Sequence, residues 1–310
     1  MEPNNRIQKK RIFPFNTALL LIAGFVLLIL LFIGFTAMLP SFMGKCVAVV
    51  NVDTPISIAG EQSSLFTSGY YGSEQLASTF RALDKRDDVG SVLIVFNSPG
   101  GSVVATREIY SAVKEMQKPK VSYFREEAAS GAYYIASGTD YIVSDPDAIT
   151  GSIGVITTFY DMSGLLEKVG INITDVTSGP HKDIGSPSRP MTEEERNITQ
   201  ALIEEVFGEF KQTVMQNRGS KLQPDLFAQV TDGRILSGRQ AVQVGLVDQT
   251  GSKRDALMRA ADMANISYTS PDDIRVCEIA THGENGAIIS ASSLFHLLSS
   301  YASSPKLSFQ

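Results

Sequence analysis

Residues 91–103 read SVLIVFNSPGGSV, and this stretch decides the fold class. Its first six residues form a short apolar run, which is typical of a strand buried on both faces of a sheet. The run ends in a Pro-Gly-Gly turn, after which Ser102 can cap a helix. The apolar residues that follow recur at helical spacing: Val104, Ala105, Ile109, Ala112, Val113 and Met116. A buried strand that turns directly into an amphipathic helix indicates an α/β protein.

Strand and helix patterns continue on both sides of this stretch. Residues 46–52 (CVAVVNV) and 120–124 (KVSYF) predict strands, and residues 73–86 predict an amphipathic helix. Further strands are expected at INITDV (171–176) and IRVCEI (274–279), with a short helix near residues 163–170. The longest helix is expected to follow Thr192, which forms a capping box with Glu195, and to stop at Gly219. The chain thus predicts one α/β catalytic domain of repeated strand–helix units, residues 40–280.

The N-terminal part of the chain predicts a membrane anchor. Residues 17–39 carry no charge, and about 20 apolar residues suffice to cross a bilayer as a helix. Residues 1–16 include four basic side chains, which predicts a cytoplasmic N-terminus. A cleaved signal peptide is the alternative, but its apolar region is normally shorter, about 7–15 residues. We expect an uncleaved single-pass anchor in the cytoplasmic membrane, with the catalytic domain extracytoplasmic.

The Ser-rich tail, residues 281–310, is harder to interpret. Its partly apolar sequence fits an amphipathic helix against the bilayer, a contact between protomers, or disorder. Because serine is frequent and charge is nearly absent, disorder or loose packing is favoured.

Charge and composition exclude several classes of function. The net charge is −6 and the N-terminus is basic, so the exported part is acidic, which argues against nucleic acid as a partner. His181, His282 and His296 form no metal-ligand spacing, and no CxxC occurs, so no metal or other cofactor is expected. Cys46 and Cys277 lie in a compartment that permits disulfides, but two buried free thiols are the favoured interpretation.

Two turns could supply a nucleophile and the donors for an oxyanion. The Pro-Gly-Gly turn leaves backbone N–H groups free for a substrate, although such a sequence is usually only a turn. In REEAASGAYYIASG (125–138), Ser130 lies at the start of a helix, where the helix dipole would favour a nucleophile. The amide of Gly131 could be a second oxyanion donor. A serine that merely caps the helix is the alternative.

A lysine is the better candidate for the base. Lys182 follows His181, and a lysine acts as a base when burial lowers its pKa enough to make it neutral. Ser/Lys pairs are an alternative to Ser/His/Asp triads. Ser152, in TGSIGV, could position such a lysine without adding charge; a simple turn serine is the alternative.

Five stretches in order resemble the signal peptide peptidase A family, the short form of these membrane-bound serine peptidases with a ClpP/crotonase-like fold. They are NSPGGSV, AASGAYYIAS, AITGSIGVI, SGPHKDIGSPSRPMTEEER and GRILSGRQAVQVGLVDQTG, within residues 46–264. The resemblance implies that Ser130 is the nucleophile, Lys182 the general base and Ser152 the group that positions the lysine. Gly101 and Gly131 would form the oxyanion hole.

The resemblance also implies what the protein acts on. The expected activity is that of a serine endopeptidase for remnant signal peptides and other apolar peptides, in a homo-oligomer, with a neutral to alkaline optimum. Ala132 departs from the family, which usually has a glycine there, and the segment VNVDTPIS lacks an expected glycine. Two other classes stay open: a crotonase-like acyl-CoA or thioester enzyme, and a non-catalytic membrane scaffold.

Overall fold

The computed structural model describes residues 24–32, 44–61 and 69–281. Residues 24–32, inside the predicted anchor, form a helix, and no helix of the described residues is long and apolar enough to span a bilayer. The rest of the anchor, residues 1–16 and the tail from residue 282 lie outside the described residues, so these predictions stay predictions. Residues 1–45 and 46–310 form separate units, and the second contains the fold described below.

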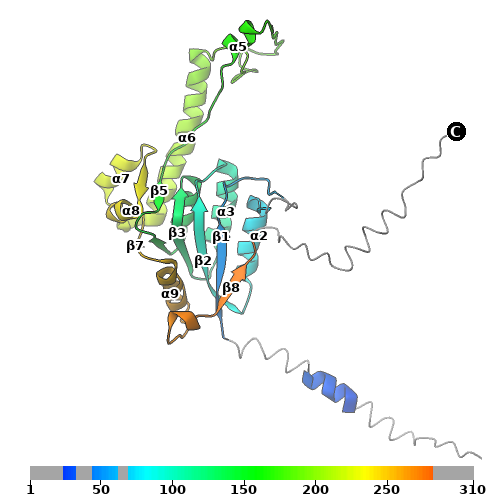
Figure 1. The fold of residues 1–310 in the computed structure, drawn as a ribbon, viewed down its shortest axis with the longest axis vertical. Helices are drawn as coiled ribbons and strands as arrows, with labels where there is room; N and C mark the ends of the chain where they lie inside the picture. The colour runs from blue at the N-terminus through cyan, green and yellow to red at the C-terminus, as the bar shows by residue number, and fades with distance from the viewer. Residues whose placement is uncertain (1–23, 33–43, 62–68, 282–310) are drawn as a thin grey trace, which may run out of the picture. The chain divides into compact units, whose positions relative to one another are not determined.

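An eight-stranded sheet organises this second unit (Figure 1). The strand order is β6-β5-β3-β2-β1-β8, with β4 beside β3 and β7 beside β4. All pairs are parallel except β5 with β6. The strands are β1 (Cys46–Val52), β2 (Val89–Ser98), β3 (Lys120–Ala129), β4 (Tyr141–Ser144), β5 (Ile149–Gly151), β6 (Ile235–Ser237), β7 (Gln249–Thr250) and β8 (Val276–Ile279). The α/β prediction is therefore confirmed.

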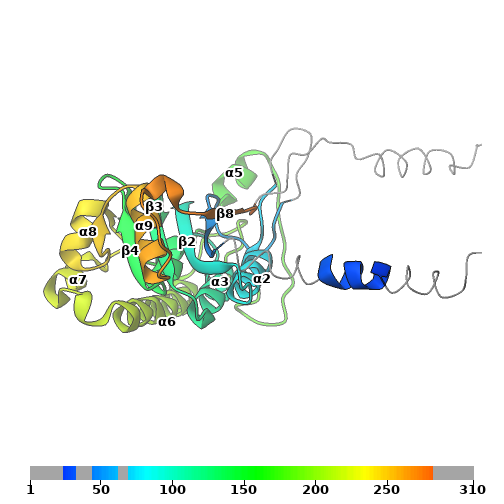
Figure 2. The same cartoon turned by 90° about the horizontal axis from the view of Figure 1, so that it is seen from below.

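Helices cover both faces of the sheet. The α-helices of this unit are α2 (Ser73–Asp84), α3 (Val103–Glu115), α4 (Gly131–Ser137), α5 (Ser163–Lys168), α6 (Glu193–Arg218), α7 (Pro224–Val230), α8 (Gly238–Val244) and α9 (Lys253–Met263). Alternate residues of a strand point to opposite faces. Accordingly, Ile94 packs in the larger core with α2 and α3, whereas Leu93 packs in the smaller core with α9. Figure 2 shows α3 and α6 along one side of the strands.

The longest helix extends beyond the globular body. At 26 residues, α6 is about 39 Å long. Apart from Glu195, its buried residues all lie in its second half, so the first half projects from the sheet (Figure 1). It carries the arm, which we define as residues 157–191, including α5. The predicted capping box is confirmed: Thr192 Oγ1 accepts from the N–H of Glu195, whose carboxylate accepts from the N–H of Thr192.

One predicted strand is wrong. Residues 171–176 have no regular secondary structure, pair with no strand, and belong to the arm. Their alternating apolar pattern fits a strand, but Ile171 and Ile173 are exposed. The arm lies away from the sheet, so no neighbouring strand can pair with it.

The favoured interpretation of the cysteines is also wrong. Cys46 and Cys277 form a disulfide, with their Cα atoms 5.9 Å apart. The reason is the sheet topology: β8 lies parallel to β1, with Cys277 opposite Ala48. The two cysteines are separated by 231 residues, so no local pattern reveals that their strands are neighbours.

Candidate active site

Ser130 occupies a strained turn between β3 and α4. Its φ is 51° and its ψ is −120°, a conformation that is unfavourable for a residue with a side chain. Such strain persists where the surrounding structure holds it, and it is concentrated at functional sites. The Ser130 side chain makes no capping hydrogen bond, so this serine does not cap α4 in the structure. The turn instead presents a half-buried hydroxyl at the end of the strand.

Two glycine amides lie beside this hydroxyl. Gly101 is held by Ile56, whose N–H donates to Gly100 O and whose carbonyl accepts from Ser102 N, both at 2.8 Å. A Cβ placed on Gly131 would lie 3.4 Å from the amide nitrogen of Gly101, so the two glycines are adjacent. Within residues 44–61 and 69–281, neither Gly101 N–H nor Gly131 N–H donates a hydrogen bond. The predicted pair of oxyanion donors is therefore brought together next to Ser130.

Ser152 lies on the neighbouring turn, after β5. Its φ of 48° is again positive, and its N–H donates to Arg234 O at 2.9 Å. Ser130 and Ser152 line one groove of about 380 Å³, which we call the Ser152 groove. The segment after Ser152, α6 and the α7–β6 turn form the rest of its lining: Gly154, Val155, Ile156, Gln200, Ile203, Glu204, Phe207, Thr231, Asp232 and Gly233. The structure thus places both predicted serines at one site.

Lys182 lies elsewhere. It is an exposed residue of the arm, next to His181, whose Nε2 is 3.5 Å from Glu194 Oε1 in the first turn of α6. The α6 residues that line the two cavities at Ser130 begin at Gln200, six positions beyond Glu194, and Lys182 lines neither cavity. Within one copy, the structure does not bring Lys182 to Ser130.

An ion-pair cluster fixes the chain around Lys182. Arg189 contacts Asp183 at 2.8 Å and Glu195 at 2.5 Å. The hydrogen bonds from Arg189 lower the pKa of Asp183 and hold the pKa of Glu195 at about 2. The lysine is therefore carried on an anchored turn of the arm.

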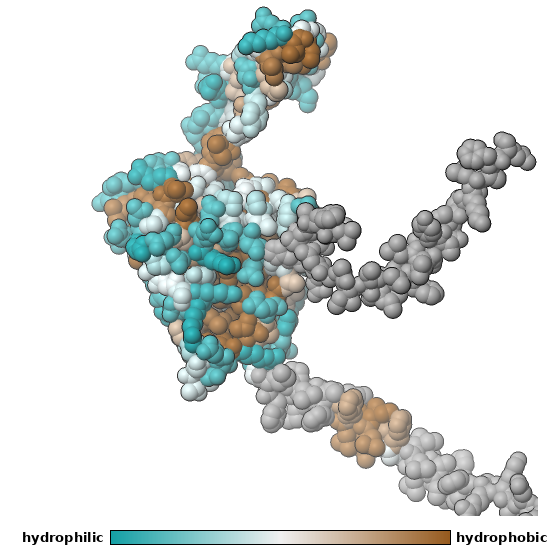
Figure 3. All heavy atoms as spheres, in the orientation of Figure 1, coloured by the Kyte–Doolittle hydropathy of each residue, from teal (hydrophilic) through white to brown (hydrophobic). Residues whose placement is uncertain are grey.

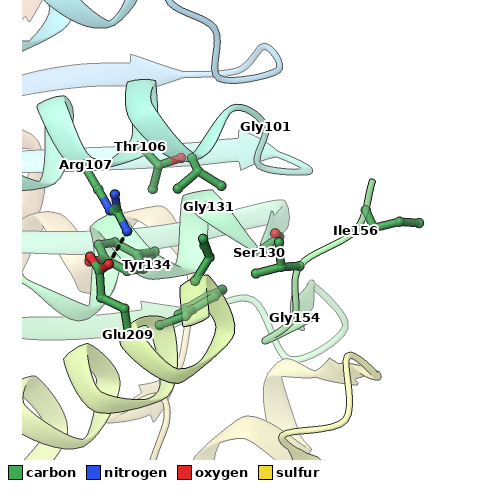
Figure 4. A pocket seen from close by; sticks show the side chains of 13 residues that line it. Gly101, Thr106, Arg107, Ser130, Gly131, Tyr134, Gly154, Ile156 and Glu209 are labelled. Atoms are coloured by element: carbon green, nitrogen blue, oxygen red, sulfur yellow. Dashed lines mark hydrogen bonds and ion pairs between the residues drawn. The ribbon is translucent and has the colours of Figure 1, made fainter. Parts of the chain in front are cut away.

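A second cavity opens beside Ser130, between α3, α4 and α6 (Figure 4). This α3–α6 cavity has a volume of about 100 Å³. Its lining residues are Gly101, Val103, Thr106, Arg107, Ser130, Gly131, Tyr134, Gly154, Val155, Ile156, Val206, Glu209 and Phe210. Most of the residues that form the walls of this cavity are not predicted from the sequence. Helical spacing from Ser102 places Thr106 near the turn, but no local signal shows that α6 packs there.

The described residues include one cluster of potential metal ligands, formed by Cys46, Asp88 and Cys277. Both sulfur atoms are taken by the disulfide, so this cluster is not suited to a metal ion.

Comparisons with known proteins give consistent matches. The profile of peptidase family S49 matches residues 112–267, and that of Clp protease matches residues 69–142. A predicted protease from Methanocaldococcus jannaschii is 41% identical over 60% of this chain and 60% of its own length. A predicted signal peptide peptidase from Enterococcus faecium is 35% identical over 69% of this chain and 62% of its own. Protease 4 of Haemophilus influenzae is 34% identical over 71% of this chain and 35% of its own length. The chain therefore covers less than two thirds of each of these relatives.

Proposed function

This chain belongs to peptidase family S49, and we propose that it is a serine endopeptidase that uses Ser130 as its nucleophile and Lys182 as its general base. The observation that carries the proposal is the turn at Ser130. A strained serine at the end of a strand faces two glycine amides that have no acceptor among the described residues. This is the arrangement that acyl transfer needs.

The proposed reaction proceeds through an acyl-enzyme. Ser130 Oγ attacks the peptide carbonyl carbon while neutral Lys182 takes the hydroxyl proton. The negative charge on the carbonyl oxygen is stabilised by the N–H groups of Gly101 and Gly131. The C–N bond then breaks, and Lys182 gives its proton to the leaving amine. Water attacks the ester by the same route in reverse, which releases the second product and restores Ser130.

Lys182 can serve this site if it comes from a second copy of the chain. Lys182 is exposed on the arm and lines neither of the two cavities that open at Ser130 of its own copy. We therefore propose a homo-oligomer in which the arm of one copy places Lys182 in the Ser152 groove of the next. The groove is open and large enough for a lysine side chain.

The surface of the arm supports this assembly. Figure 3 shows apolar side chains gathered towards the end of the arm. The exposed large apolar residues of the arm are Phe159, Tyr160, Met162, Leu165, Val169, Ile171, Ile173 and Val176. Such a patch favours a protein partner. A second copy accounts for both this patch and the incomplete site.

Docking would also prepare the lysine chemically. Contact of Lys182 with Ile203 and Phe207 in the groove would favour the uncharged amine that a general base requires. The amine must then lie away from the carboxylates of Glu204 and Asp232 in the same lining, which would favour the charged form. The hydroxyl of Ser152 could accept a hydrogen bond from that amine or donate one to it, and it adds no charge. This is the proposed positioning role of Ser152.

We propose remnant signal peptides and other apolar peptides as substrates, cleaved at the outer face of the cytoplasmic membrane. The α3–α6 cavity beside Ser130 has a mainly apolar lining, which suits an apolar substrate side chain. The predicted anchor at residues 17–39 would hold the enzyme next to such peptides.

The first experiment compares the wild type with Ser130→Ala and Lys182→Ala, after circular dichroism has shown that each is folded. We expect the wild type to react with a fluorophosphonate probe and to cleave apolar peptides. Ser130→Ala should lose both properties, and Lys182→Ala should lose cleavage. Thioester turnover that survives Ser130→Ala would support the acyl-CoA alternative. A folded wild type that neither reacts nor cleaves would support the scaffold.

The second experiment tests the shared site. Ser130→Ala and Lys182→Ala subunits are co-expressed with different tags and purified as mixed oligomers. If Lys182 acts on a neighbouring copy, about a quarter of the sites in a random mixture contain both groups, so activity returns. If both groups act within one copy, every site in the mixture lacks one of them and the mixture stays inactive.

A further inference from the structure

We propose that the ion pair between Arg107 and Glu209 is a specificity-determining latch: it closes the far end of the α3–α6 cavity and limits the length of the substrate side chain that the cavity accepts. The inference rests on the proposed peptidase function, and it concerns the side chain that enters the cavity next to Ser130.

The pair lies where a substrate side chain would end. In Figure 4, Arg107 and Glu209 are on the opposite side of the cavity from Ser130. Arg107 comes from α3 and Glu209 from α6, and the guanidinium donates a hydrogen bond to the carboxylate. The pair therefore bridges the two helices across the end of the cavity. These two residues are the charged members of the lining described above.

The side walls of the cavity are better fixed than its end. The Tyr134 ring contacts Tyr110 at 4.9 Å and Phe210 at 5.1 Å between centroids. Its hydroxyl lies 3.1 Å from Thr213 Oγ1 and donates a longer hydrogen bond, of 3.4 Å, to Glu209 Oε1. Tyr134 and Thr106 are buried, whereas the side chains of Arg107 and Glu209 are 41% and 46% exposed. The end of the cavity is thus the part of its boundary that can open towards solvent.

Other contacts set the distance between α3 and α6. Lys114 Nζ donates to Asn217 Oδ1 at 2.8 Å, and Asn217 Nδ2 donates to the hydroxyl of Tyr110 at 3.0 Å and to Ser137 Oγ at 3.1 Å. Asn217 lies eight residues, or about two helical turns, beyond Glu209. Loss of the latch should therefore leave the two helices in place and open only the end of the cavity.

The latch makes a prediction about side-chain length. A short aliphatic side chain, such as leucine, can occupy the cavity while the ion pair stays closed. A longer or aromatic side chain would have to displace the pair. Arg107 and Glu209 would then lose their mutual attraction while lying beside an apolar group, which is unfavourable. Because an exposed ion pair contributes little, the expected discrimination is modest, about tenfold rather than a complete exclusion.

The test measures kcat/KM of the full-length enzyme for two peptides that differ only in the residue before the scissile bond, leucine or phenylalanine. The double variant Arg107→Ala with Glu209→Ala should raise the phenylalanine-to-leucine ratio about tenfold. The charge-swapped variant, Arg107→Glu with Glu209→Arg, should retain the wild-type ratio because it restores the pair. If the double alanine variant fails to fold, Arg107→Ala alone opens the same end without changing α6.

The matched control removes an exposed ion pair far from the cavity, between Arg81 and Glu115, which lie 3.7 Å apart. Arg81→Ala with Glu115→Ala should leave the ratio unchanged. An unchanged ratio in the folded Arg107 variants, or an equal change in the control, would overturn the latch while leaving the peptidase function intact. A wild type that cleaves neither peptide would overturn both.

Discussion

The backbone N–H of Ser130 donates a hydrogen bond to the carbonyl oxygen of Gly151 at 2.9 Å, so the turn that carries Ser130 is fixed to the turn that carries Ser152. Both serines have a positive φ, a conformation shared among the described non-glycine residues only by Asn265. Two neighbouring strained turns are thus held by the same pair of strands, β3 and β5. The arrangement keeps both hydroxyls at one site.

Loss of the Ser152 hydroxyl should slow the reaction without destabilising the fold. Ser152→Ala removes the hydroxyl that we propose positions Lys182, so kcat should fall about 10²-fold with a smaller change in KM. Stopped assays across a pH series provide the measurement, because a mispositioned base should also shift the pH profile. Ser78→Ala, an exposed serine on α2, serves as control and should leave activity unchanged. Equal activity of both variants would rule out the positioning role.

Gly131 should tolerate no side chain. In Gly131→Ala, the new Cβ would lie 2.4 Å from Thr106 Oγ1, and the turn must shift to avoid this contact. Loss of one oxyanion donor typically costs about 10²–10³ in rate, and a loss of that size is expected in kcat. Thr106→Ala removes the contacting atom, so the combined variant should recover at least tenfold over Gly131→Ala. No recovery would show that a different contact disturbs the amide.

Local signals explain which parts of this architecture can be predicted from the sequence. The strand and turn at residues 91–103 and the helix after Thr192 are predictable, because periodicity and capping act over a few residues. The Cys46–Cys277 disulfide and the position of α6 across the cavity are not, since both depend on which distant elements become neighbours. The strand predicted in the arm fails for a different reason: the apolar residues of 171–176 alternate as in a strand, but they remain exposed.

The disulfide should make a large contribution to stability. It closes a loop of 231 residues and ties the edge strand β8 to β1. Cys277→Ser should lower the free energy of unfolding by about 2–5 kcal/mol, measured by urea denaturation. A reductant should lower the stability of the wild type in the same way and leave that of Cys277→Ser unchanged. Equal stability of the two proteins would contradict a structural role for the bridge.

A buried ion pair near the end of α6 is a second stability element. Arg218 donates to both carboxylate oxygens of Asp248 at 3.0 Å and to Gly245 O at 3.0 Å. Burial opposes ionisation of Asp248 most strongly, but the hydrogen bonds and charge of Arg218, together with hydrogen bonds from Lys221 and from the N–H of Ile142, outweigh it and keep the pKa of Asp248 below its usual value.

Asp248→Asn should therefore destabilise the fold by about 3–5 kcal/mol, because it leaves a buried guanidinium without its partner. Urea denaturation measures the change. The exposed pair of Arg254 and Asp272 provides the comparison, and Arg254→Ala should cost less than about 1 kcal/mol. Similar losses in the two variants would mean that burial does not set the contribution of these pairs.

Acid should loosen the turn that carries Lys182. The pKa values of Asp183 and Glu195 are lowered by hydrogen bonds from Arg189, to about 2 for Glu195. A lowered pKa means that the stabilisation is fully present above the ordinary carboxyl pKa and is lost as the pH falls through the folded-state value. As the pH falls from about 4 towards 2, this stabilisation is lost and the cluster should open.

Amide hydrogen exchange of residues 180–195 at pH 6 and pH 2.5 measures this opening, expressed as protection factors so that the intrinsic pH dependence of exchange is removed. The wild type should lose protection at pH 2.5. Arg189→Gln should already be poorly protected at pH 6 and should change little with pH, because its carboxylates have lost their partner. Arg234→Gln breaks an exposed pair with Asp232, outside the arm, and should behave as the wild type does. If Arg189→Gln instead loses as much protection on acidification as the wild type, other groups control the turn, and the anchoring of Lys182 must be sought in the capping of α6.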